Sequence, residues 1–232
     1  MPKLILASQS QSRKYLLDRL RIPYQAIPAN IDESALPNEP PQQLVLRLAK
    51  QKAEKIANKV SEYITKNKTS DINKSFIIIG SDQLVCLDDH VFGKPLNHQN
   101  SVKQLTMMSD KWVECCTAVA LYQVSVDNSN KTNKSNKKPQ IKLIKQYTNQ
   151  DKVKIKKLST QTIEDYVTKE QPFQCAGSVQ YESLGIALVD TIHSPDPTAI
   201  IGLPLLKITT WLQELGFDLF KVYNNTVNKL DI

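Results

Sequence analysis

Apolar and polar positions along the first half of the chain fall into blocks that predict strands and helices in turn. Short apolar runs bounded by polar turns indicate buried strands, whereas apolar residues spaced three and four apart indicate helices. Paired prolines precede a long periodic segment and fit a helix start, where proline is tolerated. The expected order is strand 3–7, polar turn 8–12, helix 13–21, strand 24–28, helix 40–60, polar stretch 61–74, strand 75–87 and helix 97–109.

The second half continues this interleaving, with strands expected at 111–126, 140–158 and 184–192 and helices at 159–170 and 203–215. An Asn-, Lys- and Ser-rich tract at 125–140 separates the first two strands and has the composition of a flexible hairpin tip. A hairpin requires antiparallel pairing, so the sheet should be mixed. We therefore expect an α/β fold: a single domain over 1–232, with a mixed twisted sheet, flanking helices and two lobes around a cleft.

Length and charge are consistent with one globular domain that has a single basic segment. The chain has 232 residues, 41% of them hydrophobic, and a net charge of +7; this length can bury a substantial core. Ten lysines and one acid, Asp151, lie between Lys131 and Lys157, so this segment carries +9 and the rest of the chain −2. Lysine without interleaved arginine or aromatic residues is a weak basis for specific nucleic-acid recognition. Nucleic acid is therefore not an expected partner.

The cysteines and the N-terminal residues favour a reduced, cytoplasmic compartment. The four cysteines show no CxxC spacing, which predicts buried reduced thiols rather than a zinc site or a disulfide framework. No apolar run reaches membrane-spanning length, and the apolar stretch at the start is too short for a signal peptide. We predict a cytoplasmic location and no membrane partner.

Asp82 lies within the apolar run at 75–87 and is the first candidate for a functional residue. A carboxylate in a buried strand costs free energy unless it is paired, hydrogen-bonded or bound to a metal. The residue has two readings: a structural aspartate that caps a turn at Gly80, or a carboxylate of an active site. Other charged residues elsewhere in the chain, described below, favour the active-site interpretation.

Cations at two places could bind an anion. Residues 8–14 read Ser-Gln-Ser-Gln-Ser-Arg-Lys at a strand end before a helix, where hydroxyls and backbone N–H groups form an anion site. Arg13 in a first helical turn opposes the helix dipole, which favours a role with a ligand over a solvated charge. Lys52 lies in the middle of the apolar face of the helix at 40–60, so its ammonium needs an anion or a path to water along the surface.

Two further segments supply acids and another cation. Asp32 and Glu33 follow a strand end; they are either solvated, or face Asp82 and supply the oxygen ligands that Mg²⁺ prefers. Lys94 lies in a Gly-Lys-Pro turn that is not a Walker A loop, because position 88 is aspartate where that motif needs glycine. Acids suited to a divalent metal and cations suited to a polyphosphate together indicate metal-assisted phosphoanhydride hydrolysis.

Seven motifs occur in order along the chain: Leu4-Ile5-Leu6-Ala7-Ser8-x-Ser10-x-x-Arg13, Asp32-Glu33, Ala49-x-x-Lys52-Ala53, Gly80-Ser81-Asp82, Gly93-Lys94-Pro95, Ala176-Gly177-Ser178 and Gly202-Leu203-Pro204-Leu205. This order resembles the Maf family of nucleoside triphosphate pyrophosphatases, whose fold is of the Maf/ITPase type. The resemblance runs from residue 2 to about 216. It omits the stretches at 61–74 and 125–140, which look like insertions, and the tail after 216.

The resemblance implies hydrolysis of the α–β phosphoanhydride of a nucleoside triphosphate substrate, with Mg²⁺ or Mn²⁺ as the cofactor. It implies that Asp82 acts as general base or as a metal-linked activator of water, and that Glu33 and Asp82 bind the metal. Family members are often homodimers, which implies a homodimer here. The residues that the resemblance assigns to the triphosphate are Lys52, Lys94, Arg13, Ser8 and Ser10.

Within the family, the chain is most similar to the 7-methyl-GTP pyrophosphatase branch. That branch has Gln after the catalytic Asp, as Gln83 is here, and Gly-Ser-x-x-x-Glu, which ends at Glu182 here; the resemblance implies that these two residues select the base. A carboxylate can accept hydrogen bonds from guanine N1–H and N2–H, and 7-methylation makes the base cationic, which strengthens such bonds. The branch commonly has proline and an aromatic residue where this chain has Gln11 and Ser12. Ser12 cannot supply the aromatic stacking, worth about 1–3 kcal/mol, which predicts weaker or less selective binding of 7-methyl-GTP.

Two alternatives therefore stay open beside a 7-methyl-GTP pyrophosphatase. One is a Maf-type pyrophosphatase with another or broader base preference, such as dTTP, UTP or CTP. The other is a non-catalytic, division-related binding protein, since some Maf relatives are associated with septum inhibition and the lysine-rich segment could contact a partner. Deletion of 125–140 would leave turnover intact in an enzyme and abolish partner binding in a binding protein.

Overall fold

The computed structural model describes residues 2–67, 75–126, 139–223, 230 and 232. No helix in these ranges is long and apolar enough to cross a membrane. The helices are α1 (Gln11–Asp18), α2 (Pro41–Asn67), α3 (His98–Met108), α4 (Thr160–Glu170) and α5 (Leu205–Glu214), with the 3₁₀ turns η2 (Ala176–Ser178), η3 (Leu184–Leu188) and η4 (Ala199–Ile201). The strands are β1 (Lys3–Leu6), β2 (Tyr24–Ala26), β3 (Phe76–Leu87), β4 (His90–Phe92), β5 (Trp112–Ser125), β6 (Gln140–Ile155) and β7 (Val189–His193).

The described strands form one seven-stranded mixed sheet in the order β2-β1-β3-β5-β6-β7, with β4 paired to β3. β1 is parallel to β2 and β3, and the remaining pairs are antiparallel. β5 and β6 pair out to Ser125 and Gln140, which confirms the predicted hairpin. The interior of its tip, at 127–138, lies outside the described residues.

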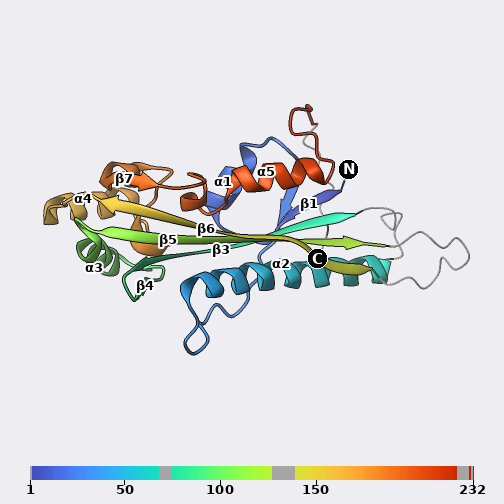
Figure 1. Ribbon diagram of the computed structural model, residues 1–232, viewed down its shortest axis with the longest axis horizontal. Coiled ribbons are helices and arrows are strands. Elements are labelled where there is room, and N and C mark those ends of the chain that lie inside the picture. Colours follow the sequence, from blue (N-terminus) through green and yellow to red (C-terminus); the bar gives the residue numbers. More distant parts are fainter. Residues whose placement is uncertain (1, 68–74, 127–138, 224–229, 231) are drawn as a thin grey trace, which may run out of the picture.

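Helices cover both faces of the sheet, as Figure 1 shows: α2 runs along one face, and α1 and α5 lie on the other. Ile56 and Val60 of α2 belong to one buried core cluster with Ile78 of β3, and Trp211 of α5 belongs to another with Leu121 of β5. A further core, built around α3, α4 and the far ends of β3, β5 and β6, fills one end of the molecule. The mixed α/β fold with flanking helices is thus confirmed.

The structure corrects both ends of the first helix and the end of the second. α1 begins at Gln11 rather than 13, because the Ser10 hydroxyl caps it by accepting from the Arg13 N–H at 3.4 Å, and it ends at Asp18 rather than 21. α2 continues to Asn67 instead of ending near 60. Its apolar face extends through Ile64, which is 4% exposed and packs in the same core as the preceding turns. Residues 68–74 of the predicted polar stretch lie outside the described residues.

The strand predicted at 184–192 is wrong in its first half, and the short strand β4 was not predicted. Residues 184–188 form η3, and β7 begins only at Val189. The chain folds back tightly there: a Cβ on Gly185 would lie 2.5 Å from the Gln180 carbonyl oxygen. β4 is too short to give a recognisable alternation in the sequence and pairs with the end of β3.

The cysteines and the tail complete the fold. All four cysteines are free thiols; Cys86, Cys115 and Cys116 are buried, whereas Cys175 is half-buried. In the tail, the Leu230 N–H donates to Gln25 Oε1 at 2.8 Å and the Gln25 amide donates to the Leu230 carbonyl at 2.9 Å. The end of the chain therefore returns to β2, the edge strand of the sheet.

Candidate active site

Two carboxylates converge on one buried lysine at the centre of the candidate site. Lys52 Nζ lies 2.5 Å from Asp82 Oδ1 and 2.6 Å from Glu33 Oε1. The side chains of Lys52 and Asp82 are 10% and 9% exposed, whereas that of Glu33 is 52% exposed. Lys52 therefore has the anion that its position on an apolar helix face requires, and Asp82 is part of a charge cluster rather than a turn cap.

A close approach of α2 to β3 produces this contact. Gly80 and Asp82 point to the same face of β3, because side chains alternate along a strand. A Cβ on Gly80 would lie 2.2 Å from the Ala49 carbonyl oxygen and 2.7 Å from the Ala53 nitrogen. Glycine in the strand and alanines in the helix let the two backbones meet, and so bring Lys52 over Asp82.

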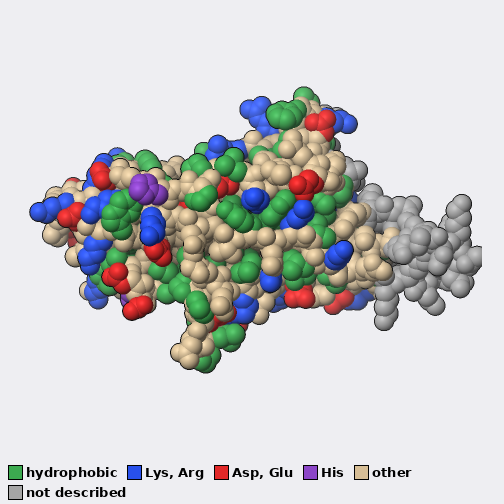
Figure 2. Space-filling view, viewed as in Figure 1, with side chains coloured by type: hydrophobic (Ala, Val, Ile, Leu, Met, Phe, Trp, Pro, Cys, Tyr) green, Lys and Arg blue, Asp and Glu red, His purple; other side chains and the backbone are tan. Residues whose placement is uncertain are grey.

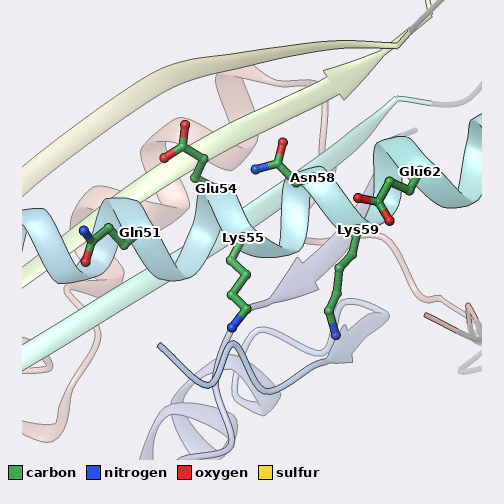
Figure 3. A pocket seen from close by; sticks show the side chains of 6 residues that line it. All are labelled: Gln51, Glu54, Lys55, Asn58, Lys59 and Glu62. Carbon is green, nitrogen blue, oxygen red and sulfur yellow. The ribbon is translucent and has the colours of Figure 1, made fainter. Parts of the chain in front are cut away.

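The segment that carries Glu33 is tied to the outer side of α2. Lys55 Nζ donates to the Asn30 carbonyl at 2.6 Å, and Figure 3 shows the Lys55 side chain pointing from the helix toward the N-terminal part of the chain. The pocket whose lining side chains Figure 3 labels lies on the solvent side of α2, and none of the predicted site residues lines it. Its lining residues are Gln51, Glu54, Lys55, Asn58, Lys59 and Glu62.

Arg47 fixes the same segment further along. It contacts Glu39 at 2.7 Å and donates to the Ser34 carbonyl at 2.9 Å. Asp32 is used locally, since its carboxylate accepts from the Ser34 N–H at 2.9 Å. Of the predicted acidic pair, only Glu33 reaches the lysine between the carboxylates.

The end of β1 and the start of α1 supply an arginine with defined anchors. Ser8 Oγ accepts from the Ser10 N–H at 3.1 Å and from Arg13 Nη1 at 3.4 Å. Arg13 Nε donates to the Gly202 carbonyl at 3.1 Å. Ser10 caps the helix, and Ser12 follows in its first turn. Hydroxyls, a helix N-terminus and a guanidinium thus lie together, in the arrangement that binds anions.

The charges of the site influence one another. Burial acts to raise the pKa of Glu33, but the hydrogen bond from Lys52 and the charges of Lys52, Lys94 and Arg13 hold it below its usual range. Burial lowers the pKa of Arg13, and the charges of Asp82 and Glu33 oppose this. Glu33 is therefore ionised at neutral pH, and five charged groups act as one cluster.

The charge of Lys94 acts on Glu33 and also on Cys175. Burial and the charge of Glu182 raise the pKa of Cys175 to about 11, and the charge of Lys94 opposes the rise. Lys94 is therefore close enough to act electrostatically on both Glu33 and Cys175, and Glu182 acts on the latter.

Gln83 does not present its amide N–H groups to a ligand. Its Nε2 donates to the carbonyls of Ala199 at 3.3 Å and Ile200 at 2.8 Å, in η4. Thr117 Oγ1 also donates to the Ala199 carbonyl, at 2.9 Å. Gln83 and Thr117 therefore hold η4 against the sheet, which leaves the Gln83 carbonyl oxygen as the group that can contact a base.

Sequence reasoning missed the residues that organise the η4–α5 corner. Asp196 is 3% exposed and accepts from the N–H groups of Thr198 at 3.1 Å and Leu206 at 2.8 Å. It caps the start of α5, where Pro204 offers no side-chain cap. The Asp-Pro-Thr run before the Gly202 motif was the available signal, because such residues favour turns and helix starts.

Glu33 and Asp82 are the acids that could hold a metal. In the described ranges, no three or more His, Cys, Asp or Glu residues form a metal-binding group. One oxygen of each carboxylate is paired with Lys52. The second oxygen of each is a hard donor of the kind that Mg²⁺ or Mn²⁺ takes, and such an ion usually binds one or two protein carboxylates and fills its remaining positions with water and substrate phosphates.

Comparisons with known proteins give one matching family model and several similar proteins. A family model described as Maf-like protein matches residues 3–215. The chain is 39% identical over 218 residues to a 7-methyl-GTP pyrophosphatase of Methylobacillus flagellatus, covering 94% of this chain and 99% of that protein. It is 40% identical to one of Albidiferax ferrireducens, covering 92% and 94%, and 36% identical to one of Vibrio vulnificus, covering 92% and 95%.

Proposed function

The chain belongs to the Maf family, and on this premise we propose that it hydrolyses 7-methyl-GTP to 7-methyl-GMP and pyrophosphate, removing a modified nucleotide. The observation that carries the proposal is the convergence of Asp82 and Glu33 on Lys52 beside Arg13. It joins an acceptor for a proton of water to cations that can bind a polyphosphate. The relatives named as 7-methyl-GTP pyrophosphatases support 7-methylguanine as the base of the substrate.

In this reaction a water oxygen bonds to the α-phosphorus, and the bond to the oxygen that bridges the α- and β-phosphates breaks. Asp82 accepts the proton of the water, and pyrophosphate leaves with the bridging oxygen. Lys52, Arg13 and Lys94 bind phosphate oxygens and offset the charge that develops on them. The low local dielectric strengthens these contacts, since Lys52 and Asp82 are largely buried.

We propose Mg²⁺ or Mn²⁺ as the cofactor, held by Glu33 and Asp82. When bound, a divalent cation neutralises phosphate charge and lowers the pKa of water. The depressed pKa of Glu33 keeps this carboxylate in the form that binds a cation. Ser8 and Ser10 complete the phosphate end of the site through their hydroxyls.

Base selection is assigned to Glu182, with the Gln83 carbonyl oxygen as a second acceptor. Both can accept from guanine, whose N1–H and N2–H groups are donors, and a cationic 7-methylated base favours the carboxylate. Ser12 offers no aromatic face for stacking, and this favours one alternative: the same chemistry with a broader base preference that includes dTTP, UTP or CTP.

The test is pyrophosphate release from 7-methyl-GTP, GTP, dTTP, UTP and CTP with Mg²⁺, comparing the wild type with Asp82→Ala. We expect strong preference for 7-methyl-GTP and loss of activity of at least about 100-fold in the variant. Asp190→Ala is the matched control, because it removes an exposed carboxylate of β7.

Two other outcomes would change the proposal. Asp82-dependent release from another base would keep the chemistry and replace the base preference. If no nucleotide gave Asp82-dependent release of pyrophosphate, the proposed enzymatic activity would be overturned, and a binding protein would be favoured.

We further propose a single domain with insertions at 61–74 and 125–140, acting as a cytoplasmic homodimer without a nucleic-acid partner. Three lysines of the basic segment are paired with acids: Lys154 with Asp110 at 2.7 Å, Lys152 with Glu114 at 3.7 Å and Lys145 with Glu214 at 2.7 Å. On the face shown in Figure 2, basic and acidic side chains are interspersed. Local pairing lowers the attraction to a polyanion. Light scattering of the purified protein tests the homodimer.

A further inference from the structure

One backbone carbonyl beside the candidate site receives two side-chain hydrogen bonds. The Gly202 carbonyl accepts from Ser81 Oγ at 2.8 Å and from Arg13 Nε at 3.1 Å. We propose that Ser81 is a positioning residue: through the Gly202 carbonyl, it aims the terminal nitrogens of Arg13 at the phosphates of the substrate. The inference rests on the proposed function for the ligand that Arg13 binds.

The donor inventory of Arg13 supports this assignment. A guanidinium has five N–H donors in a rigid plane. Nε is used by the Gly202 carbonyl, and Nη1 makes one longer contact, to Ser8 Oγ at 3.4 Å. Because the group is planar, the bond at Nε and the contact at Nη1 together restrict the direction of the remaining terminal N–H groups. Those terminal groups are the ones that bind a phosphate in two-point fashion.

The backbone at Gly202 is shaped to the arginine. Its φ is 128°, a conformation that residues with a side chain rarely adopt. A Cβ there would lie 3.2 Å from Arg13 Cγ and 3.3 Å from its Nε. Glycine therefore permits both the conformation that presents the carbonyl and the close passage of the Arg13 stem.

Ser81 connects this arrangement to the catalytic carboxylate. It precedes Asp82 on β3 and is fully buried. Because side chains alternate along a strand, Asp82 meets Lys52 on one face while Ser81 meets the Gly202 carbonyl on the other. One strand thus sets the placement of both the carboxylate and the arginine.

A purely structural role, in which Ser81 only ties η4 and its flank to the sheet, is the competing explanation. Thr117 provides the matched comparison. It is also fully buried, and its hydroxyl also donates to a carbonyl of this segment, that of Ala199 at 2.9 Å. The Arg13 side chain donates to the Gly202 carbonyl rather than to that of Ala199.

The experiment is a double-mutant cycle. Ser81→Ala and Thr117→Val are made in the wild type and in Arg13→Ala, and unfolding midpoints check that all variants fold. The two readouts are kcat/KM for the best nucleotide and the affinity for inorganic tripolyphosphate by calorimetry. We expect Ser81→Ala to lower both by roughly tenfold, the scale of one hydrogen bond. We expect no further loss in Arg13→Ala, and a change within about twofold for Thr117→Val.

Two results would overturn the inference. One is an equal loss in Thr117→Val, which would show that tying down η4 is the whole effect. The other is a loss from Ser81→Ala that persists in Arg13→Ala. A wild type that releases no pyrophosphate contradicts the proposed function, yet tripolyphosphate affinity still tests Ser81. Tripolyphosphate binding that does not depend on Arg13 would overturn the inference by itself.

Discussion

At the scale of single residues, Lys52 is the group on which the site depends. Its ammonium lies between two carboxylates that would otherwise repel each other. Burial acts to raise the pKa of Glu33, and the hydrogen bond and charge of Lys52, together with the charges of Lys94 and Arg13, hold it below its usual range. The lysine therefore both binds phosphate in the proposed reaction and keeps Glu33 ionised.

Lys52→Met should separate these two effects. We expect kcat/KM to fall by about 100-fold or more, the scale of one lost charge-stabilising donor. The pKa of Glu33 should rise when its partner is lost, so the acidic limb of the pH–rate profile should move to higher pH. Lys59→Met, an exposed change on the same helix, is the control and should retain activity. An unmoved acidic limb would contradict the assignment to Glu33.

At the scale of elements, the contact between α2 and β3 determines the geometry of the site. Asp82 is on the strand and Lys52 on the helix, so their distance follows the separation of the two backbones. The space at Gly80 is limited by backbone atoms of α2 rather than by a flexible side chain. A larger residue there must push the helix away.

Gly80→Ala is therefore expected to destabilise the protein by about 1–3 kcal/mol, the usual cost of overpacking, and to lower activity by separating Lys52 from Asp82. Urea denaturation and pyrophosphate release measure the two effects. Gly93→Ala is the stability control, because a Cβ at Gly93 would have nothing within 4 Å. Equal stability of the two variants would show that the close approach is not under steric constraint.

At the scale of the whole molecule, a buried polar cluster lies where η4 and β7 meet the sheet. Asp151 of β6 is fully buried; its Oδ1 accepts from the Asn149 amide at 2.5 Å, and its Oδ2 has no hydrogen-bond partner of good geometry in the described part of the chain. Burial and the charge of Asp196 raise the pKa of Asp151, and this outweighs the nearby Ser194 hydroxyl and Asn149. The folded state thus favours the protonated carboxyl.

The raised pKa of Asp151 predicts a pH-dependent stability. Between the ordinary pKa, about 3.9, and the raised folded value, the folded state binds more protons than the unfolded state, so stability falls as pH rises. Asp151→Asn removes this fall, and its unfolding midpoint should exceed that of the wild type at pH 8. Melting curves from pH 4 to 8 measure the effect. Asp165→Asn, an exposed change on α4, is the control; parallel curves for the wild type and Asp151→Asn would contradict the prediction.

The main strands and helices, the antiparallel hairpin and the position of Lys52 on a buried helix face could all be predicted from the sequence, whereas β4 and η3 could not. These features follow from the local hydrophobic periodicity and from the composition of turns. Both can be recognised within a short segment without knowing where that segment lies in the fold. The same local logic identified Asp82, because a carboxylate in an apolar strand is conspicuous without any knowledge of its partner.

Which polar residues contact one another became known from the folded structure alone. It brought Glu33 and not Asp32 to Lys52, turned the Gln83 amide to the backbone of η4, and joined Ser81 to Arg13 through Gly202. These outcomes depend on how closely distant backbones approach and on which groups face each other after packing. Periodicity carries no information on either, since it describes one segment at a time.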